Sequence, residues 1–171
     1  MKRKIILATL FAGVCGISNA QFWNYSAPEK VGGTINTSAS EESIPVFSKD
    51  SSILYFVRTY DESNKGGEQD QDVWFSRKDA NGGYSDCERL KDVNNKFNNA
   101  VLGLNSTGSS MYLLNSYEGK KDLLKGVTVS NGGGESWSKP EGVHIPSLDI
   151  EGGFYGFHVN GKENVVIISY A

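Results

Sequence analysis

One seven-residue phrase occurs three times in this chain, and this repetition constrains the fold more than any other feature. Its form is an aromatic residue, Ser, any residue, Pro or Cys, Glu, any residue and an aliphatic residue. The copies are Tyr25–Val31, Tyr84–Leu90 and Trp137–Val143, which lie 59 and 53 residues apart. Repetition at near-equal spacing indicates a protein built from copies of one supersecondary unit.

A hairpin pattern repeats in step with this phrase. In Glu41–Phe56, the short apolar run Ile44–Phe47 is followed by the polar turn formers Ser48–Ser52 and by the β-branched and aromatic run Ile53–Val57. This order predicts strand, tight turn and strand. We align Phe47–Phe56 with Leu104–Leu113 and with Phe157–Ile167, the last copy being one residue longer in its turn. A third strand, Asp72–Ser76, aligns with Asp122–Gly126.

These repeats predict an all-β fold made of four-stranded antiparallel blades, because about four strands in roughly 50 to 60 residues is the size of a β-propeller blade. The first blade spans about 41–91, the second about 97–143, and a third begins at about 150–171. The phrase at Tyr25–Val31 precedes any hairpin, so it is expected as an orphan outer strand. About two and a half blades cannot close a ring. We therefore interpret residues 21–171 as an incomplete propeller, the N-terminal portion of a larger protein; the alternative is a self-contained small β-sandwich.

The first twenty residues predict a secretory signal peptide. Basic Lys2–Lys4 precede an apolar stretch, Ile5–Ile17, that is too short to span a membrane, and Ser18–Ala20 supplies small residues for cleavage. The alternative is a lipoprotein signal acylated at Cys15, which the preceding Val14 disfavours. The protein is therefore expected in the periplasm, at the outer membrane, or secreted, with no transmembrane segment.

The composition of the mature chain disfavours several classes of partner. Cleavage removes three of the 17 basic residues and none of the 20 acidic ones, which leaves a net charge of −6. No excess of cations is available to neutralise phosphates, so nucleic-acid binding is not expected. The single remaining cysteine, Cys87, is expected to be buried as a small apolar residue; pairing with another chain and loss of a former partner are the alternatives.

Several residues of the first unit resemble the signature of WD-like or TolB-like β-propeller repeats of the bacterial envelope. They are Glu42, Pro45, Phe47, Ser48, Asp50, Leu54, Tyr55 and Phe56, followed by Gly66-Gly67 and Asp72-Val73-Trp74, with Trp137–Val143 in the later copy. The second unit has Leu102 and Thr107 at the places of Pro45 and Asp50. The resemblance implies a protein-interaction or scaffold module that contacts other envelope proteins. Such repeats often stand beside an OmpA-like peptidoglycan-binding domain, so a peptidoglycan link is implied only through a domain outside these residues.

A second resemblance concerns the segment Ser130–Trp137, which is similar to the Asp-box turn of sialidase-like propellers. Gly132 stands where that turn has its defining Asp. A sialidase would also need an arginine cluster, a tyrosine nucleophile and an acid. Arg58 and Tyr60 alone do not supply these, so an active sialidase is not expected.

Four further sets of residues were weighed for chemistry. The acidic residues Asp61, Glu62, Glu68, Asp70 and Asp72 flank a Gly66-Gly67 loop and could bind Ca²⁺, but the known calcium-loop spacing is absent and a solvated loop is favoured. His144 and His158 have no metal-ligand spacing. The aromatic residues Trp23, Tyr25, Trp74, Phe75, Tyr84 and Trp137 could line a carbohydrate surface or simply form core. Asn94, Asn95, Asn98 and Asn99 could contact a ligand, although a turn role is favoured.

The sequence thus assigns no catalytic, cofactor-binding or metal-binding residues and no cofactor. It predicts a non-enzymatic, exported propeller segment that acts as a protein-interaction or scaffold module in the cell envelope. The alternative is a secreted carbohydrate-binding or sialidase-like, glycan-active propeller.

Overall fold

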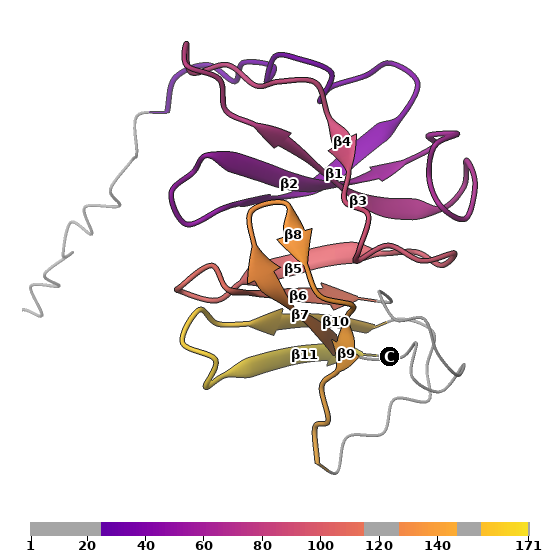
Figure 1. Ribbon diagram of the computed structural model, residues 1–171, viewed down its shortest axis with the longest axis vertical. Coiled ribbons are helices and arrows are strands. Elements are labelled where there is room, and N and C mark those ends of the chain that lie inside the picture. Colours follow the sequence, from indigo (N-terminus) through magenta and orange to yellow (C-terminus); the bar gives the residue numbers. More distant parts are fainter. Residues whose placement is uncertain (1–24, 115–126, 147–154, 171) are drawn as a thin grey trace, which may run out of the picture.

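The computed structural model describes residues 25–114, 127–146 and 155–170, and within these ranges the chain forms only strands, turns and loops (Figure 1). All strand pairs are antiparallel, and they form sheets of four, five and two strands, none of which closes into a barrel. The all-β prediction is confirmed. The expected signal peptide and Trp23 lie outside the described residues.

The first sheet is a meander of four strands in the order β1-β2-β3-β4. Its strands are β1 (Glu41–Phe47), β2 (Ile53–Thr59), β3 (Gln71–Arg77) and β4 (Glu88–Arg89). The expected hairpin is therefore present as β1 and β2, and a bulge shifts their register between Ser43 and Val46. Strand β2 is buried along its whole length. Its apolar residues face both sides of the sheet, as in a strand covered on two faces.

The second sheet has the order β5-β6-β7-β8, with β9 also paired to β7. Its strands are β5 (Ala100–Leu104), β6 (Ser110–Leu114), β7 (Val127–Gly133), β8 (Ser136–Trp137) and β9 (Glu141–Gly142). The segment expected as the third strand, Asp122–Gly126, lies outside the described residues. In the described chain β7 pairs with β6 as β3 pairs with β2.

A two-stranded hairpin follows, formed by β10 (Tyr155–Val159) and β11 (Val166–Tyr170). The two sheets and the hairpin are stacked in layers along the long axis of the molecule (Figure 1). The first strands of the three layers, β1, β5 and β10, lie next to one another in that order.

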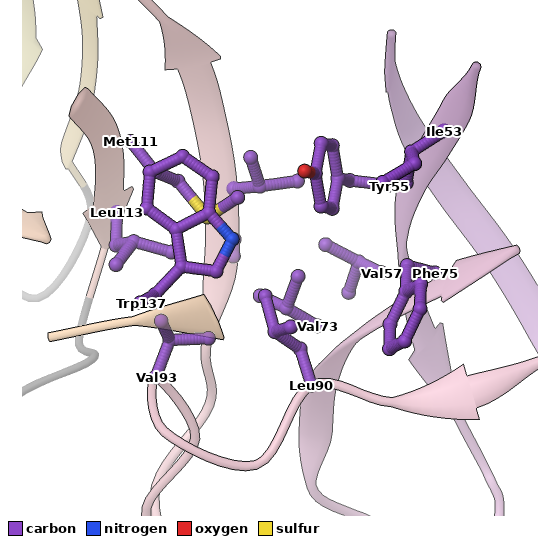
Figure 2. Close-up of a cluster of buried hydrophobic side chains, with 12 residues drawn as sticks. Ile53, Tyr55, Val57, Val73, Phe75, Leu90, Val93, Met111, Leu113 and Trp137 are labelled. Carbon is purple, nitrogen blue, oxygen red and sulfur yellow. The ribbon is translucent and has the colours of Figure 1, made fainter. Parts of the chain in front are cut away.

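The main core lies between the two larger sheets. Figure 2 shows Tyr55, Val57 and Phe75 of the first sheet facing Met111, Leu113 and Trp137 of the second. A second cluster joins the second sheet to the hairpin through Tyr112 and Val127 on one side and Phe157 and Val159 on the other. Alternate residues of β6 thus enter different cores, because successive side chains of a strand point to opposite faces.

The outer face of the first sheet is covered by the N-terminal segment. Ile35 packs with Leu54, Phe56 and Trp74 in a third buried cluster. The expected orphan outer strand at Tyr25–Val31 is wrong, because these residues form no strand and Tyr25 is 84% exposed. A strand needs a neighbour to pair its backbone groups, and residues 25–31 have no partner strand in the described chain.

The three hairpins share one turn of six residues, which in the first copy is Ser48–Ile53. In each, the first residue donates its N–H to the carbonyl of the sixth and accepts from the N–H of the fourth; the copies begin at Ser48, Asn105 and Asn160. The fourth residue is in the left-handed region each time, at Ser51, Gly108 and Glu163. The expected longer turn in the third copy is therefore wrong. The third hairpin aligns Val159, rather than Phe157, with Leu104.

Candidate functional site

The acidic loop before β3 is part of the sheet's own hydrogen bonding. Asp72 is fully buried, and its Oδ2 accepts from the backbone N–H of Lys65 at 2.8 Å and lies 3.4 Å from Arg89 Nη1. Burial raises the pKa of Asp72 to about 6, against the opposing effect of the Lys65 bond. Asp70 accepts from the N–H of Gly66, and burial raises its pKa as well. These two carboxylates hold the loop onto β3.

The other acidic residues of this loop lie apart from that pair. Asp61 pairs with Arg58 at 3.4 Å, and Glu62 and Glu68 are exposed. Within residues 25–114, 127–146 and 155–170, no three His, Cys, Asp or Glu side chains come together as a metal site would require. Both histidines are exposed, and His158 lies on β10.

The asparagine-rich connection between the two sheets is buried structure. Asn94 accepts from the N–H of Val73 at 2.7 Å and donates to the carbonyls of Leu90 and Val73. The side chain thus pairs with the β3 backbone beside β4. Asn95 and Asn99 bond each other, and Asn98 is exposed. The turn role that the sequence favours is the one observed for the three buried asparagines.

Most of the aromatic residues lie in cores. Trp74 is buried under the N-terminal segment and Tyr84 packs against that cluster, whereas Phe75 and Trp137 are buried between the two larger sheets. They therefore occupy different layers and do not form one surface. Tyr25 is the exposed member of the set within the described chain.

Arg58, considered as a substrate-binding arginine, is buried and holds the N-terminal segment on the first sheet. The side chain is 4% exposed, and its guanidinium lies 4.5 Å from the ring centre of Trp74 and 5.3 Å from that of Phe56. It donates to the carbonyls of Thr34 and Ile35 and lies 3.3 Å from Glu42. Tyr60, the residue that follows β2, is exposed.

Cys87 lies beside this arginine. It packs against the cluster of Ile35 and Trp74, and its backbone N–H donates to Thr34 Oγ1. The thiol is half-buried, and burial raises its pKa. A neutral, packed thiol agrees with the expected role as a small apolar residue.

The Ser130–Trp137 turn clamps the two larger sheets together. The carbonyl of Gly134 accepts from Tyr55 Oη at 2.5 Å and from Trp137 Nε1 at 3.0 Å. The two rings meet edge to face, 6.2 Å apart. Glu135 adds an exposed ion pair with Arg77. The turn that resembles an Asp-box thus has a packing role.

The repeated phrase bonds in the same way in both sheets. In the first sheet the hydroxyl of Ser76 donates to the backbone carbonyl of Ser85. In the second sheet the hydroxyl of Ser130 donates to that of Ser138. The hydroxyls of Ser85 and Ser138 accept from the N–H groups of Arg77 and Asn131. The phrase is therefore the connection that returns the chain beside the third strand of each sheet.

The candidate functional site is the edge of the stack beside β11. Ile167 is 62% exposed, and the neighbouring Val165 and Val166 are exposed as well. A small cavity of about 110 Å³ lies between the hairpin on one side and β6, β7 and the segment after β9 on the other. It is lined by Tyr112, Val127, Val143, Ile145, Val159, Glu163 and Val166.

Among the described residues that line this cavity, Glu163 is the carboxylic acid. Its Oε1 accepts from Tyr112 Oη at 2.6 Å and from Asn105 Nδ2 at 3.3 Å. Burial, followed by the bond to Glu163, raises the pKa of Tyr112 to about 12, so this hydroxyl remains a donor. The site is therefore an apolar surface whose carboxylate is already held by the second sheet.

Sequence reasoning missed this site because it misaligned the third turn. With the longer turn, Ile167 corresponds to Phe56 and Leu113. With the observed turn, Ile167 corresponds to Tyr55 and Tyr112. Its cross-strand partner is His158, and the partners of Tyr55 and Tyr112 are the equivalent residues Val46 and Gly103. Aligning the first turn residues Ser48, Asn105 and Asn160 would have revealed it.

Searches against protein-family models, curated proteins and solved structures found no match to this chain. Among the described residues, no helix is long and apolar enough to cross a membrane.

Proposed function

We propose that this chain is a non-enzymatic, exported β-propeller segment that serves as a protein-interaction or scaffold module in the cell envelope. Three properties support the propeller part: the shared six-residue turn, the stacking of antiparallel layers, and the succession of β1, β5 and β10 as neighbouring first strands. Neighbouring blades of a propeller pack face to face in this manner. The basic and apolar start of the sequence supports export.

One observation carries the interaction role: the stack is covered at one end and exposed at the other. The N-terminal segment covers the outer face of the first sheet, whereas Ile167 and its neighbours remain exposed on β11. Exposed apolar residues on an edge strand favour pairing or packing with another polypeptide. Arg58, considered as a substrate-binding arginine, and Asp72, considered as a Ca²⁺ ligand, are both engaged in holding loops.

The experiment is in-cell cross-linking of a tagged protein in its own host, followed by fractionation. The proposal predicts a cross-linked complex with an envelope protein, in the periplasmic or outer-membrane fraction, that reforms from purified components. A matched Ile167→Asp variant should lose the complex. Specific binding on a glycan array, together with no protein complex, would instead support the carbohydrate-binding alternative.

A further inference from the structure

The sequence contains three Asn-Gly dipeptides, at Asn81-Gly82, Asn131-Gly132 and Asn160-Gly161. An asparagine side-chain amide can be attacked by the backbone nitrogen of the next residue, and glycine leaves that nitrogen accessible because it has no side chain. The attack requires the asparagine side chain to turn toward the peptide bond that follows it. The three sites share their reacting residues, so the fold around each site decides which of them can react.

Two of the three asparagine side chains are held by hydrogen bonds. Asn160 Oδ1 accepts from the N–H groups of Asn164 and Val165, each at 3.0 Å, and Asn160 Nδ2 donates to Asn164 Oδ1 at 2.8 Å. Asn131 Oδ1 accepts from Ser110 Oγ at 3.1 Å across the pair of β6 and β7. Reaction at either asparagine therefore requires these bonds to break first.

The glycines that follow these two asparagines are enclosed by neighbouring backbone. The N–H of Gly132 donates to the carbonyl of Ser109 at 2.9 Å, and a Cβ added to Gly132 would clash with the carbonyl oxygen of Ser136. A Cβ added to Gly161 would lie 3.5 Å from the backbone nitrogen of Ser106. Little room is left at either glycine for the change of backbone geometry that ring closure requires.

Asn81-Gly82 lies in an exposed turn between β3 and β4 and lacks these restraints. Within the described residues, the side chain of Asn81 makes no hydrogen bond. The nearest described atom to a Cβ added to Gly82 would be Cε of Lys78, at 3.9 Å. The N–H of Gly82 donates to the carbonyl of Asp79 at 3.1 Å, and such a bond at the surface opens at little cost in free energy.

The turn itself requires glycine at the reactive position. Gly82 has a φ of 84°, in the left-handed region that residues with a Cβ rarely adopt. Asn-Gly is favoured in tight turns for this reason. The residues that form the turn are therefore also the reactive pair.

We propose that Asn81 is the site at which the native protein deamidates, giving aspartate and β-linked isoaspartate at this turn. The Gly82 nitrogen forms a bond to Asn81 Cγ, the Cγ–Nδ2 bond breaks, and the Gly82 N–H proton leaves with Nδ2 as ammonia. Water then opens the resulting succinimide at either of its carbonyls. Water is the one reactant consumed, and the inference is independent of the proposed function.

The modification changes the connection between β3 and β4. Either product adds a carboxylate to a turn that already holds Asp79, whose Oδ1 accepts from the N–H groups of Asn81 and Gly83. The isoaspartyl form also inserts a carbon atom into the main chain, which alters the spacing of the bonds between Asp79 and Gly83. We therefore expect it to release the pairing of Lys78 with Tyr84, where the repeated phrase begins.

The test is peptide mapping of the purified protein during incubation at pH 8 and 37 °C. Mass spectrometry measures conversion of asparagine at each of the three sites, and an isoaspartyl methyltransferase detects the β-linked product. In the native protein, conversion at Asn81 should be at least about tenfold faster than at Asn131 or Asn160, because those two need local opening. In concentrated urea the three rates should agree within about threefold, since the folded surroundings are removed.

Two variants separate this site from general ageing of the sample. Asn81→Gln lengthens the side chain and disfavours ring closure, so it should abolish the first acidic species that native ion-exchange chromatography resolves. Asn131→Gln is a matched change at another exposed Asn-Gly pair. It should leave the rate at which that species forms within about twofold.

Equal conversion at the three sites in the native protein overturns the inference, as does an unchanged Asn81 in a sample whose other sites react. The same order of rates in urea as in the native protein also overturns it, because the neighbouring sequence rather than the fold would then set the difference. Loss of the first acidic species in Asn131→Gln would assign the modification to that residue instead.

Discussion

The two ends of the stack carry the same kind of hairpin in opposite environments. At the first sheet, Leu54 and Phe56 of β2 are covered by the N-terminal segment, which Arg58 holds by its bonds to Thr34 and Ile35. At the hairpin of β10 and β11, the outward residue Ile167 is exposed. The difference shows that the repeat fixes which face of its sheet each residue lies on, while the neighbouring segment decides whether that face is buried.

The largest expected effect comes from Tyr55→Ala, which truncates the most deeply buried of the three equivalent residues Tyr55, Tyr112 and Ile167. Its ring is fully buried against Trp137 and its hydroxyl donates to Gly134, so truncation leaves a cavity and removes one of the two donors to that carbonyl. We expect a loss of about 3–5 kcal/mol in the free energy of unfolding. Urea denaturation followed by tryptophan fluorescence measures it.

The control for this prediction is Ile167→Ala at the equivalent exposed position. It should change stability by less than about 0.5 kcal/mol. Comparable losses at both positions would contradict the contrast between a covered Tyr55 and an exposed Ile167.

Arg58→Ala tests what holds the N-terminal segment on the first sheet. The substitution leaves two backbone carbonyls and Glu42 without their buried cation and uncovers the face of Trp74. We expect a loss of about 2 kcal/mol, below that of a fully buried pair because Glu42 and Asp61 are partly solvated. Cys87 should also react faster with a thiol reagent in the native protein.

The contrasting substitution is Arg77→Ala, whose ion pairs with Glu88 and Glu135 lie at the surface. It should leave the labelling rate of Cys87 unchanged. Faster labelling in both variants would mean that global opening, rather than release of the segment, exposes the thiol.

Asp72 gives the first sheet a distinctive pH dependence. Burial raises its pKa from 3.8 to about 6, so between these values the folded protein binds more protons than the unfolded chain. Its contribution to stability is therefore full below about pH 4 and declines as the pH rises toward 6. In Asp72→Asn, which retains an acceptor for the Lys65 N–H, this decline in the free energy of unfolding should be absent. The wild type should therefore lose roughly 2–3 kcal/mol relative to the variant as the pH rises from about 4 to above 6.

Denaturation of both proteins from pH 4 to pH 7 measures the difference, because the other carboxylates titrate in each. A difference that grew more favourable to the wild type with rising pH would have the wrong sign. It would show that the charged form of Asp72 is the stabilised one.

The smallest expected effect concerns the exposed link between the two larger sheets. Glu135→Gln weakens its pair with Arg77, whose side chains are 43% and 38% exposed. We expect about 0.5 kcal/mol or less, and less still at high salt. A loss of several kcal/mol that persisted in 1 M salt would assign to this pair the role that we give to Tyr55 and Trp137.

The hairpins could be predicted because Ile44–Phe47 and Ile53–Val57 flank a run of turn-forming residues. Two other elements were not established in this way. Asp122–Gly126, aligned in sequence with the third strand of the first sheet, lies outside the described residues, and within them β7 is the strand that pairs with β6. Tyr25–Val31 resembles later copies in sequence but has no adjacent strand in the described chain.

The candidate site depended on register. An apparent extra residue in the third turn placed Ile167 at the wrong face, and a one-residue slip moves every side chain of a strand to the opposite side. Composition gives no signal here, since Ile167 is as apolar as the buried residues of β2. Only the hydrogen bonds of the turn at Asn160 establish the alignment.

The carbonyl of Gly134 has a consequence for how the molecule opens. It accepts from Tyr55 of the first sheet and from Trp137 within its own turn of the second sheet, so separating the two sheets removes the Tyr55 donor and leaves the Trp137 bond in place. Because the rings of Tyr55 and Trp137 also meet edge to face, the two sheets should exchange their amide hydrogens as one cooperative unit. The hairpin of β10 and β11 is tied by the turn-to-turn bond from Ser106 to Gly161 and by Glu163, both near the surface. It should open first, which would make the edge beside β11 the most adaptable part of the molecule.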